Sequence, residues 1–393
     1  MRTKPPRRGW AAILPALALF LGARCSLPWN VPGPRVVEIV SYNAHNLFDD
    51  QQDGGEYPEF IPGSSGWNAS LYKTRLENTA FAAASPFSGD GAATTAPSWP
   101  DILCLAEIEG EKVLKDLAEG PMAKVGYRWM ALGTESASAI RCGILSRFPI
   151  LACRSHALGD AWGFGPLRDM LEVDIGLWED GKSGGKGDGE DGEVLTLFLC
   201  HWKSRKEGAR ETEEARRQAA ELLSRRMREI QALDPLRALV ACGDFNENPD
   251  EYLRAGRAYP TAFAPPDSGS PGKPGGTIEV CSSLEALKAG PPPSQDLRGS
   301  GSLRLFSPWE QEGGYSYVFQ GAGERLDGFL LAPSLADGKG LEFDDFRVGS
   351  SPELFGQDGV PAGWNGRSGY SDHLPVGIRL SSSLYNRGGF MEK

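Results

Sequence analysis

Short apolar runs recur along this chain, and several of them end in polar residues that can take part in chemistry. The run from Ala238 to Cys242 predicts a buried strand, which Gly243 breaks and which Asp244 and Asn246 follow directly. A carboxylate and a carboxamide two positions apart can converge on one ligand. Polar residues after a single strand form an ordinary turn in most proteins, so this segment alone decides little.

Comparable strand ends elsewhere in the chain change that interpretation. Runs that begin at positions 39, 102 and 194 predict three further strands, and they end in Asn43, Glu107 and His201. Asp327 lies within another apolar run, from 325 to 331, where a buried carboxylate is costly unless it is paired. We therefore expect a histidine partner for Asp327. Of the four histidines in the chain, His201 and His373 stand at such strand ends.

Helical patterns separate these strands. One helix is predicted to begin near Asn68, a second spans 109–117, a third spans 208–234 and a brief one lies near 282–288. Strands that alternate with helices favour a layered α/β domain.

Two adjacent apolar runs, 140–146 and 150–156, predict a hairpin, and a further strand is expected from Arg168 to Ile175. Cys142 and Cys153 would face each other across that hairpin, so a disulfide there stays open in an exported protein. The cysteines of the predicted core strands, Cys104, Cys200 and Cys242, are expected to be small buried thiols.

The candidate residues are spread over the whole chain, which favours one domain, from 36 to 382, over two. Two insertions are expected within it. The segment 181–193 is rich in Gly, Asp and Lys, and the segment 265–302 is rich in Pro, Gly and Ser and predicts long loops around the brief helix.

Residues 1–25 have the layout of a secretory signal or a lipoprotein signal, with basic residues followed by an apolar run and small residues. Lipidation of Cys25, simple cleavage and an uncleaved anchor all remain open, because Arg24 departs from the small residue usual before a lipidated cysteine. Removal of these residues takes away five cations and lowers the formal charge from -11 to -16. The sequence thus predicts an exported, acidic protein, in the extracellular space, the periplasm or anchored to a membrane surface.

The polar strand ends, taken in order, resemble the endonuclease/exonuclease/phosphatase superfamily with the deoxyribonuclease-I-like fold. The motifs are Tyr42-Asn43, Glu107 after its strand, His201, Gly243-Asp-Phe-Asn246, Arg325-Leu-Asp327 and Ser371-Asp-His373. The resemblance spans roughly residues 36 to 380, and no single motif is specific. It implies a four-layer α/β sandwich in which two packed mixed β-sheets are flanked by helices. It also implies a divalent-metal-dependent phosphodiesterase.

The resemblance assigns a metal site to Glu107, supported by Asn43 and Asp372. Mg²⁺ is the expected ion, and Mn²⁺ or Ca²⁺ is an alternative, since hard cations prefer oxygen ligands. Asn43 is also expected to contact the substrate.

The remaining members of the set have catalytic roles by the same resemblance. His373 would pair with Asp327, which fixes the tautomer of the imidazole. Asp244 would orient or deprotonate the attacking water, while Asn246 and His201 donate to the phosphate oxygens. The sequence leaves open whether Asp244 or His373 is the base.

The expected substrate is nucleic acid. Lys203 and Arg205 follow His201 and would contact a polyanionic strand, and the chain looks like the bacterial exported, nuclease-like branch of the family. His45 stands where the abasic-DNA branch has an acidic residue, which weakens a repair role. His45, Asn46 and Asn248 receive no firm role, and His156 is expected on the surface.

Three alternatives to a nuclease remain. A lipid headgroup phosphodiesterase resembling sphingomyelinase would need an exposed apolar hairpin, for which 162–164 and Trp364 are the candidates. A phosphatase would use the same core, and a non-catalytic surface binding protein would lack catalytic residues, none of which is missing. No obligate protein partner is evident.

Overall fold

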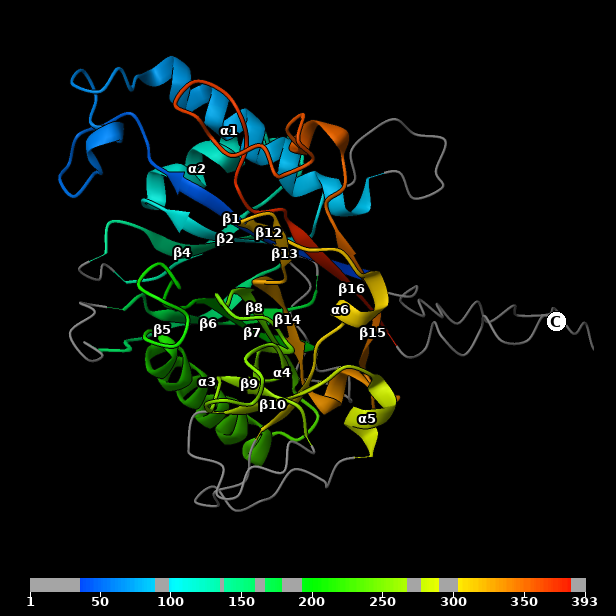
Figure 1. Cartoon of the computed structure of the whole chain (residues 1–393). Helices are drawn as coiled ribbons and strands as arrows, with labels where there is room; N and C mark the ends of the chain where they lie inside the picture. Colours follow the sequence, from blue (N-terminus) through cyan, green and yellow to red (C-terminus); the bar gives the residue numbers. More distant parts are fainter. Residues whose placement is uncertain are drawn as a thin grey trace, which may run out of the picture. The chain divides into compact units, whose positions relative to one another are not determined.

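Two mixed β-sheets lie face to face at the centre of the protein (Figure 1). The computed structural model describes residues 36–88, 99–134, 138–159, 167–178, 193–266, 277–289 and 303–382. All of these belong to the unit formed by residues 34–393.

The first sheet has six strands among the described residues. In spatial order they are β15 (Leu341–Val348), β16 (Val376–Ser382), β1 (Val36–Leu47), β2 (Ile102–Ile108), β4 (Arg141–Ser146) and β3 (Trp129–Leu132). Strands β1 and β2 run parallel, so their carboxyl ends lie at the same edge of the sheet.

The second sheet has eight strands in the described part of the chain. In order they are β5 (Ile150–His156), β6 (Met170–Gly176), β7 (Val194–His201), β8 (Ala238–Asp244), β14 (Asp327–Leu331), β11 (Arg304–Phe306), β10 (Ile278–Cys281) and β9 (Phe263–Ala264). A separate two-stranded hairpin consists of β12 (Tyr317–Phe319) and β13 (Ala322–Glu324).

Helices cover the outer faces of both sheets (Figure 1). The helices are α1 (Ala69–Ala84), α2 (Glu111–Glu119), α3 (Glu213–Leu233), α4 (Glu251–Arg254), α5 (Leu284–Lys288) and α6 (Trp309–Glu312). Short 3-10 turns lie at Pro58–Phe60, Ser85–Phe87, Pro333–Leu335 and Pro352–Leu354. The predicted four layers are therefore confirmed, with α1 and α2 on the first sheet and α3 on the second.

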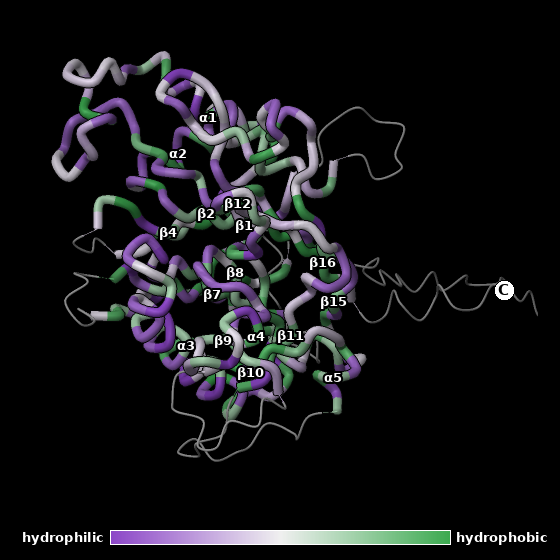
Figure 2. Tube along the Cα trace, in the orientation of Figure 1, coloured by the Kyte–Doolittle hydropathy of each residue, from purple (hydrophilic) through white to green (hydrophobic). Residues whose placement is uncertain are grey.

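The strands are apolar on both faces because each sheet is covered on both sides. Ile39 and Leu195 belong to the core between the sheets, whereas Val40 packs in the core beneath α1 and α2. In Figure 2 green, hydrophobic segments recur along the strands, while the helices have mixed colours. Burial of one such side chain stabilises the fold by about 1.5–3 kcal/mol.

Helix α1 begins where the sequence predicts, since the side chain of Asn68 accepts hydrogen bonds from the N–H groups of Ser70 and Leu71. Helix α3 begins at Glu213, five residues later than expected, and ends ahead of Pro235. In the described part of the chain, no helix combines the length and apolar character required to cross a membrane.

The predicted hairpin between 140–146 and 150–156 is wrong. Strand β4 lies in the first sheet and β5 in the second, so the turn between them crosses from one sheet to the other. Cys142 and Cys153 are both free thiols, so no disulfide joins them. Both strands lie in sheets that pack against other parts of the protein. Their apolar patterns are therefore the same as those of two strands paired in a hairpin, and the pattern alone does not distinguish the two arrangements.

The structure describes only parts of the two predicted insertions. Most of the first, 181–192, lies outside the described residues, as do 267–276 and 290–302 of the second. The described part of the second insertion contains the expected helix α5, but it also contributes β10 to the second sheet, which the sequence did not predict.

Candidate active site

Three neighbouring strands of the second sheet bring their polar residues to one edge. Strand β7 runs parallel to β8 with His201 opposite Asp244, and β14 runs antiparallel to β8 with Asp327 opposite Asp244. Gly243 permits the close approach of β7 and β8. It has a φ of 131°, and a Cβ there would lie 1.9 Å from the carbonyl oxygen of Cys200.

Asn43 joins this edge to the first sheet. Its Nδ2 donates to Oδ2 of Asp244 over 3.0 Å and to Oε1 of Glu107 over 3.3 Å. Nε2 of His201 lies 3.4 Å from the same oxygen of Glu107. Four of the predicted site residues, from four different strands, are thus in direct contact across the sandwich.

The backbone is strained at these strand ends. Among the described non-glycine residues with positive φ are His45 at 53°, Asn46 at 58°, Glu107 at 59° and Asn246 at 50°. The pairing registers of β1 with β2 and of β2 with β4 shift at the same places. Such strain persists only where surrounding contacts enforce it, and it concentrates at functional sites.

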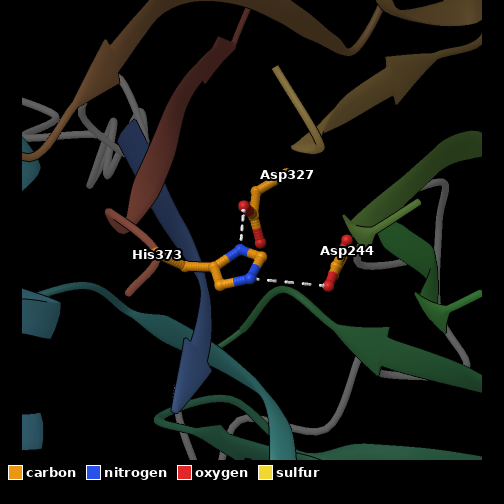
Figure 3. Close-up of side chains that lie close together, drawn as sticks. All are labelled: Asp244, Asp327 and His373. Carbon is orange, nitrogen blue, oxygen red and sulfur yellow. Dashed lines mark hydrogen bonds and ion pairs between the residues drawn. The ribbon is translucent and has the colours of Figure 1, made fainter. Parts of the chain in front are cut away.

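His373 lies between two carboxylates (Figure 3). Its Nδ1 is 2.7 Å from Oδ2 of Asp327, which confirms the predicted histidine partner, and its Nε2 is 4.0 Å from Oδ2 of Asp244. The three side chains are nearly removed from solvent, with exposed fractions of 8%, 1% and 2% for His373, Asp327 and Asp244.

Burial and charge shift the protonation of this cluster. Burial disfavours charge on His373, but the carboxylates of Asp327 and Asp244 outweigh it and hold its pKa well above the usual value. Burial, together with the charge of Asp327, raises the pKa of Asp244 from 3.8 to about 7. Asp244 is therefore able to take up or release a proton near neutral pH.

The pKa of His201 is shifted in the opposite direction to that of His373. Burial and the positive charges of Arg168 and His373 hold the pKa of His201 well below its usual value, so its imidazole is neutral. A neutral ring donates through one nitrogen only.

Comparison with known proteins places the chain among phosphoric ester hydrolases. A family model described as the endonuclease/exonuclease/phosphatase family matches residues 38–256, which is more than half of the chain. The chain belongs to the endonuclease/exonuclease/phosphatase family. A comparison with curated proteins finds no match.

Several solved structures are similar to this chain. A D. rerio TDP2 humanized by 14 mutations is 14% identical and has a TM-score of 0.47, with 88% of this chain and 98% of that chain covered. A family protein from Bacteroides thetaiotaomicron is 14% identical, covered to 88% and 98%, with a TM-score of 0.45. A mannosyl-6-phosphatase from the same species is 15% identical, covered to 88% and 99%, with a TM-score of 0.44. At these identities the similarity concerns the fold alone.

Enzymes of this family typically require a divalent metal, and the donor atoms present fit one. Glu107, Asp244, Asp327 and Asp372 supply carboxylate oxygens, and Oδ1 of Asp327 is buried without a hydrogen-bond partner among the described residues. Asp244, Asp327 and His373 also have donor atoms within 4.8 Å of one another. This excess of oxygen donors and negative charge suits a hard cation such as Mg²⁺.

Asp372 lies at the rim of the candidate site. Its side chain is 42% exposed, and Oδ1 lies 3.3 Å from Nδ1 of His45. The charges of Asp372 and Glu107 both act on His45. The metal-site role of Asp372 stays a prediction. Burial lowers the pKa of His45, and its Nδ1, although close to Asp372, makes no hydrogen bond among the described residues.

The two cations assigned to substrate are engaged by acids. Nζ of Lys203 lies 2.9 Å from Glu207, and Arg205 lies 3.1 Å from Glu251 and 3.6 Å from Glu324. Their substrate role also stays a prediction, and these ion pairs reduce the positive charge that they present.

Two asparagines of the Asp244 segment have structural contacts. Nδ2 of Asn246 donates to the carbonyl of Trp202 over 3.1 Å. Nδ2 of Asn248 donates to Glu251 and Glu324, while its Oδ1 accepts from the N–H of Arg325. Asn248 thus ties the segment after β8 to the segment that leads into Asp327. Since Nδ2 of Asn246 contacts the backbone, its role as a hydrogen-bond donor to the phosphate stays a prediction.

His156 is half-buried rather than on the open surface, and its Nε2 lies 2.7 Å from Glu172. This pair belongs to an ion network on β5 and β6, which also includes Arg154. His156 has no contact with the candidate site in the described part of the chain.

Sequence reasoning missed Arg75 of α1, which is only 1% exposed. Its guanidinium donates to the carbonyls of Ala44, His45 and Tyr370 over 2.6–2.8 Å. Burial lowers the pKa of Arg75 to about 10, so it stays charged at neutral pH. A charged residue within the small, apolar face of a predicted helix was the available signal.

Ser371 links the end of β1 to the segment that carries His373. Its hydroxyl donates to the carbonyl of Asn43 over 2.8 Å and accepts from the N–H of His373. Arg75 and Ser371 together hold the strained end of β1 against the segment that carries His373.

Proposed function

We propose that this protein is an exported, divalent-metal-dependent phosphodiesterase that hydrolyses DNA or RNA. The observation that carries the proposal is the cluster of Asp244, His373 and Asp327, joined through Asn43 to Glu107. It combines a carboxylate able to accept a proton near pH 7, a charged imidazole and a set of oxygen ligands.

In the proposed reaction, Asp244 accepts the proton of the attacking water, because its raised pKa matches the working pH. The water oxygen bonds to phosphorus, and the bond from phosphorus to the leaving oxygen breaks. His373 stays protonated through Asp327 and donates to a phosphate oxygen. This arrangement favours Asp244 over His373 as the base.

Glu107, with Asp372 at the rim, would hold the metal. Asn43, also predicted as a ligand, directs its NH2 group at Glu107 while its oxygen accepts from the N–H of His45, so it would orient Glu107 instead. When bound, Mg²⁺ would neutralise charge that develops on the phosphate and on the leaving oxygen. Asn43 then has two functions, since it also orients Asp244 by donating to Oδ2. Neutral His201, beside Glu107, would donate one hydrogen bond to the phosphate.

A smaller phosphoester is the second candidate substrate. The ion pairs of Lys203 and Arg205 with neighbouring acids favour it, because they weaken the attraction for a long polyanion. A lipid substrate has less support. Trp364 is half-buried, packs edge-on against Trp67 and lies under Arg75, and 162–164 lies outside the described residues.

The purified chain without residues 1–25 should be assayed against plasmid DNA, single-stranded RNA, sphingomyelin and bis-p-nitrophenyl phosphate. Each substrate is tested with Mg²⁺ and with a chelator. Chelator-sensitive cleavage of DNA or RNA is the expected result. Cleavage of the small diester alone would move the assignment to a small phosphoester, cleavage of sphingomyelin alone to a lipid headgroup, and no cleavage would overturn the proposal.

Export and membrane attachment are tested separately. Residues 1–25 lie outside the described residues, and the proposal rests on their signal-like composition. Intact-mass measurement of the mature chain distinguishes a lipid-modified Cys25 from simple cleavage. A full-length, soluble product in the cytoplasm would refute export.

A further inference from the structure

The β12–β13 hairpin is attached directly to both members of the His373–Asp327 pair. The hydroxyl of Ser316 accepts from the N–H of Asp327 over 3.0 Å, and its carbonyl accepts from the N–H of Leu374 over 2.7 Å. Tyr317 and His373 also form an isolated β-bridge. The first residue of the hairpin is therefore fixed relative to the catalytic imidazole by backbone contacts.

The ring of Tyr317 packs against the ring of His373. The ring centroids are 4.6 Å apart, and the planes are inclined by 31°. Since Asp327 holds one nitrogen of the imidazole and Tyr317 covers one face, rotation of His373 is restricted from two directions.

The hydroxyl of Tyr317 has no hydrogen-bond partner among the described residues. Three other tyrosines among the described residues do have a hydroxyl partner. The hydroxyls of Tyr72, Tyr127 and Tyr315 donate to Asp116, to the carbonyl of Pro100 and to the carbonyl of Gly359. A half-buried phenol usually finds a partner, so the hydroxyl of Tyr317 is available to a ligand.

The acidic groups that act on this hydroxyl belong to the candidate site. Burial and the negative charges of Asp372, Asp244 and Glu107 raise the pKa of Tyr317, and Arg205 opposes them. The phenol therefore keeps its proton at neutral pH and can donate a hydrogen bond to a ligand. A phosphate oxygen can accept such a bond.

We propose that Tyr317 is a further substrate-binding residue of this site. Its hydroxyl donates to a non-bridging oxygen of the phosphate, while its ring holds the imidazole of His373 in position. This assignment rests on the proposed phosphodiesterase function, which supplies the phosphate. It gives the hairpin a role that neither the sequence motifs nor the family match assigns.

Two substitutions separate the two parts of the role. Tyr317→Phe keeps the ring and removes the hydroxyl, whereas Tyr317→Leu removes both. Tyr315→Phe is the matched control, because it removes a neighbouring hydroxyl that is occupied by the carbonyl of Gly359. Hydrolysis of bis-p-nitrophenyl phosphate with Mg²⁺ and calorimetric binding of inorganic phosphate are measured on each, with Tm as the folding check.

Loss of one hydrogen bond to a charged group predicts that Tyr317→Phe lowers kcat/KM and phosphate affinity by about 10- to 100-fold at unchanged Tm. Tyr317→Leu should lower kcat further, because Asp327 alone then restricts the rotation of His373. Tyr315→Phe should keep full activity with a lower Tm.

Wild-type values for Tyr317→Phe in both assays would overturn the hydroxyl assignment, even if Tyr317→Leu were impaired. Calorimetry also separates this inference from the function that it rests on. If the wild type bound phosphate but hydrolysed no diester, the proposed function would fail, and weaker phosphate binding by Tyr317→Phe would still support the assignment. Absence of phosphate binding by the wild type would overturn it.

Discussion

Replacement of Asp244 by asparagine should abolish activity and yet stabilise the protein at alkaline pH. Asp244 is buried, and its neighbours include the carboxylate of Asp327. Its two oxygens accept from Nδ2 of Asn43 and from the N–H of Asn246. The carboxamide introduced by Asp244→Asn would have the shape and the neutral charge of the protonated acid, so it tests the cost of ionisation at this position. Its NH2 group cannot accept, so one of these two hydrogen bonds is lost at every pH.

The size of the effect follows from the pKa of Asp244, which is 3.8 in ordinary surroundings and about 7 here. The unfolded chain releases this proton first, so stability falls as the pH rises from about 4 to about 7 and stays lower above that. A shift of about 3 units at about 1.36 kcal/mol each amounts to about 4 kcal/mol at pH 8. The attraction between Asp244 and His373 is already part of this value, since it opposes the rise in the pKa of Asp244.

The measurement is urea denaturation of wild type and Asp244→Asn at pH 4 and pH 8, with a chelator present throughout. We expect the variant to be less stable by about 1–3 kcal/mol at pH 4, where only the lost hydrogen bond counts, and more stable by about 1–3 kcal/mol at pH 8. Equal destabilisation of the variant at both pH values would refute the reasoning, since it would show that no ionisation penalty exists at Asp244.

Three further predictions follow from the same geometry. His373→Ala should lower kcat by about 10²–10⁴-fold, measured on the best substrate at pH 7, and should also lower Tm, because it leaves the buried carboxylate of Asp327 without its partner; unchanged turnover of the folded variant would remove His373 from the mechanism. Glu107→Gln should weaken Mg²⁺ binding in a calorimetric titration by at least about 10-fold, and an unaltered affinity would place the metal elsewhere. Gly243→Ala should destabilise the fold by more than about 4 kcal/mol, because its Cβ would overlap the carbonyl of Cys200; a Tm within a few degrees of wild type would contradict the close strand approach.

The sequence was sufficient to predict which polar residues stand at the strand ends. An apolar run and the polar residue that ends it are local features, so Asn43, Glu107, His201 and Asp244 could be identified without knowledge of the fold. The need for a partner of Asp327 also follows from one position, because a buried carboxylate is costly in any fold. Their order along the chain carried the resemblance that the family match confirmed.

Contacts between distant segments could not be predicted in this way. The apolar runs on either side of Ser146–Pro149 have the same pattern in a hairpin as in two separate sheets, and only sheet packing distinguishes the two. Lys203 and Arg205 lie in a basic segment by sequence, but most of the acids that neutralise them come from other elements of the fold.

The sequence by itself therefore determined the residue types, their places at the ends of strands and the family of the protein. The tertiary structure decided their protonation and their partners. The contact of Asn43 with Asp244 joins two sheets over 201 positions of chain, and the stacking of Tyr317 on His373 depends on a hairpin outside both sheets. The physical reason is that charge states and hydrogen bonds depend on burial and on distances between groups, which arise only when the two sheets pack together.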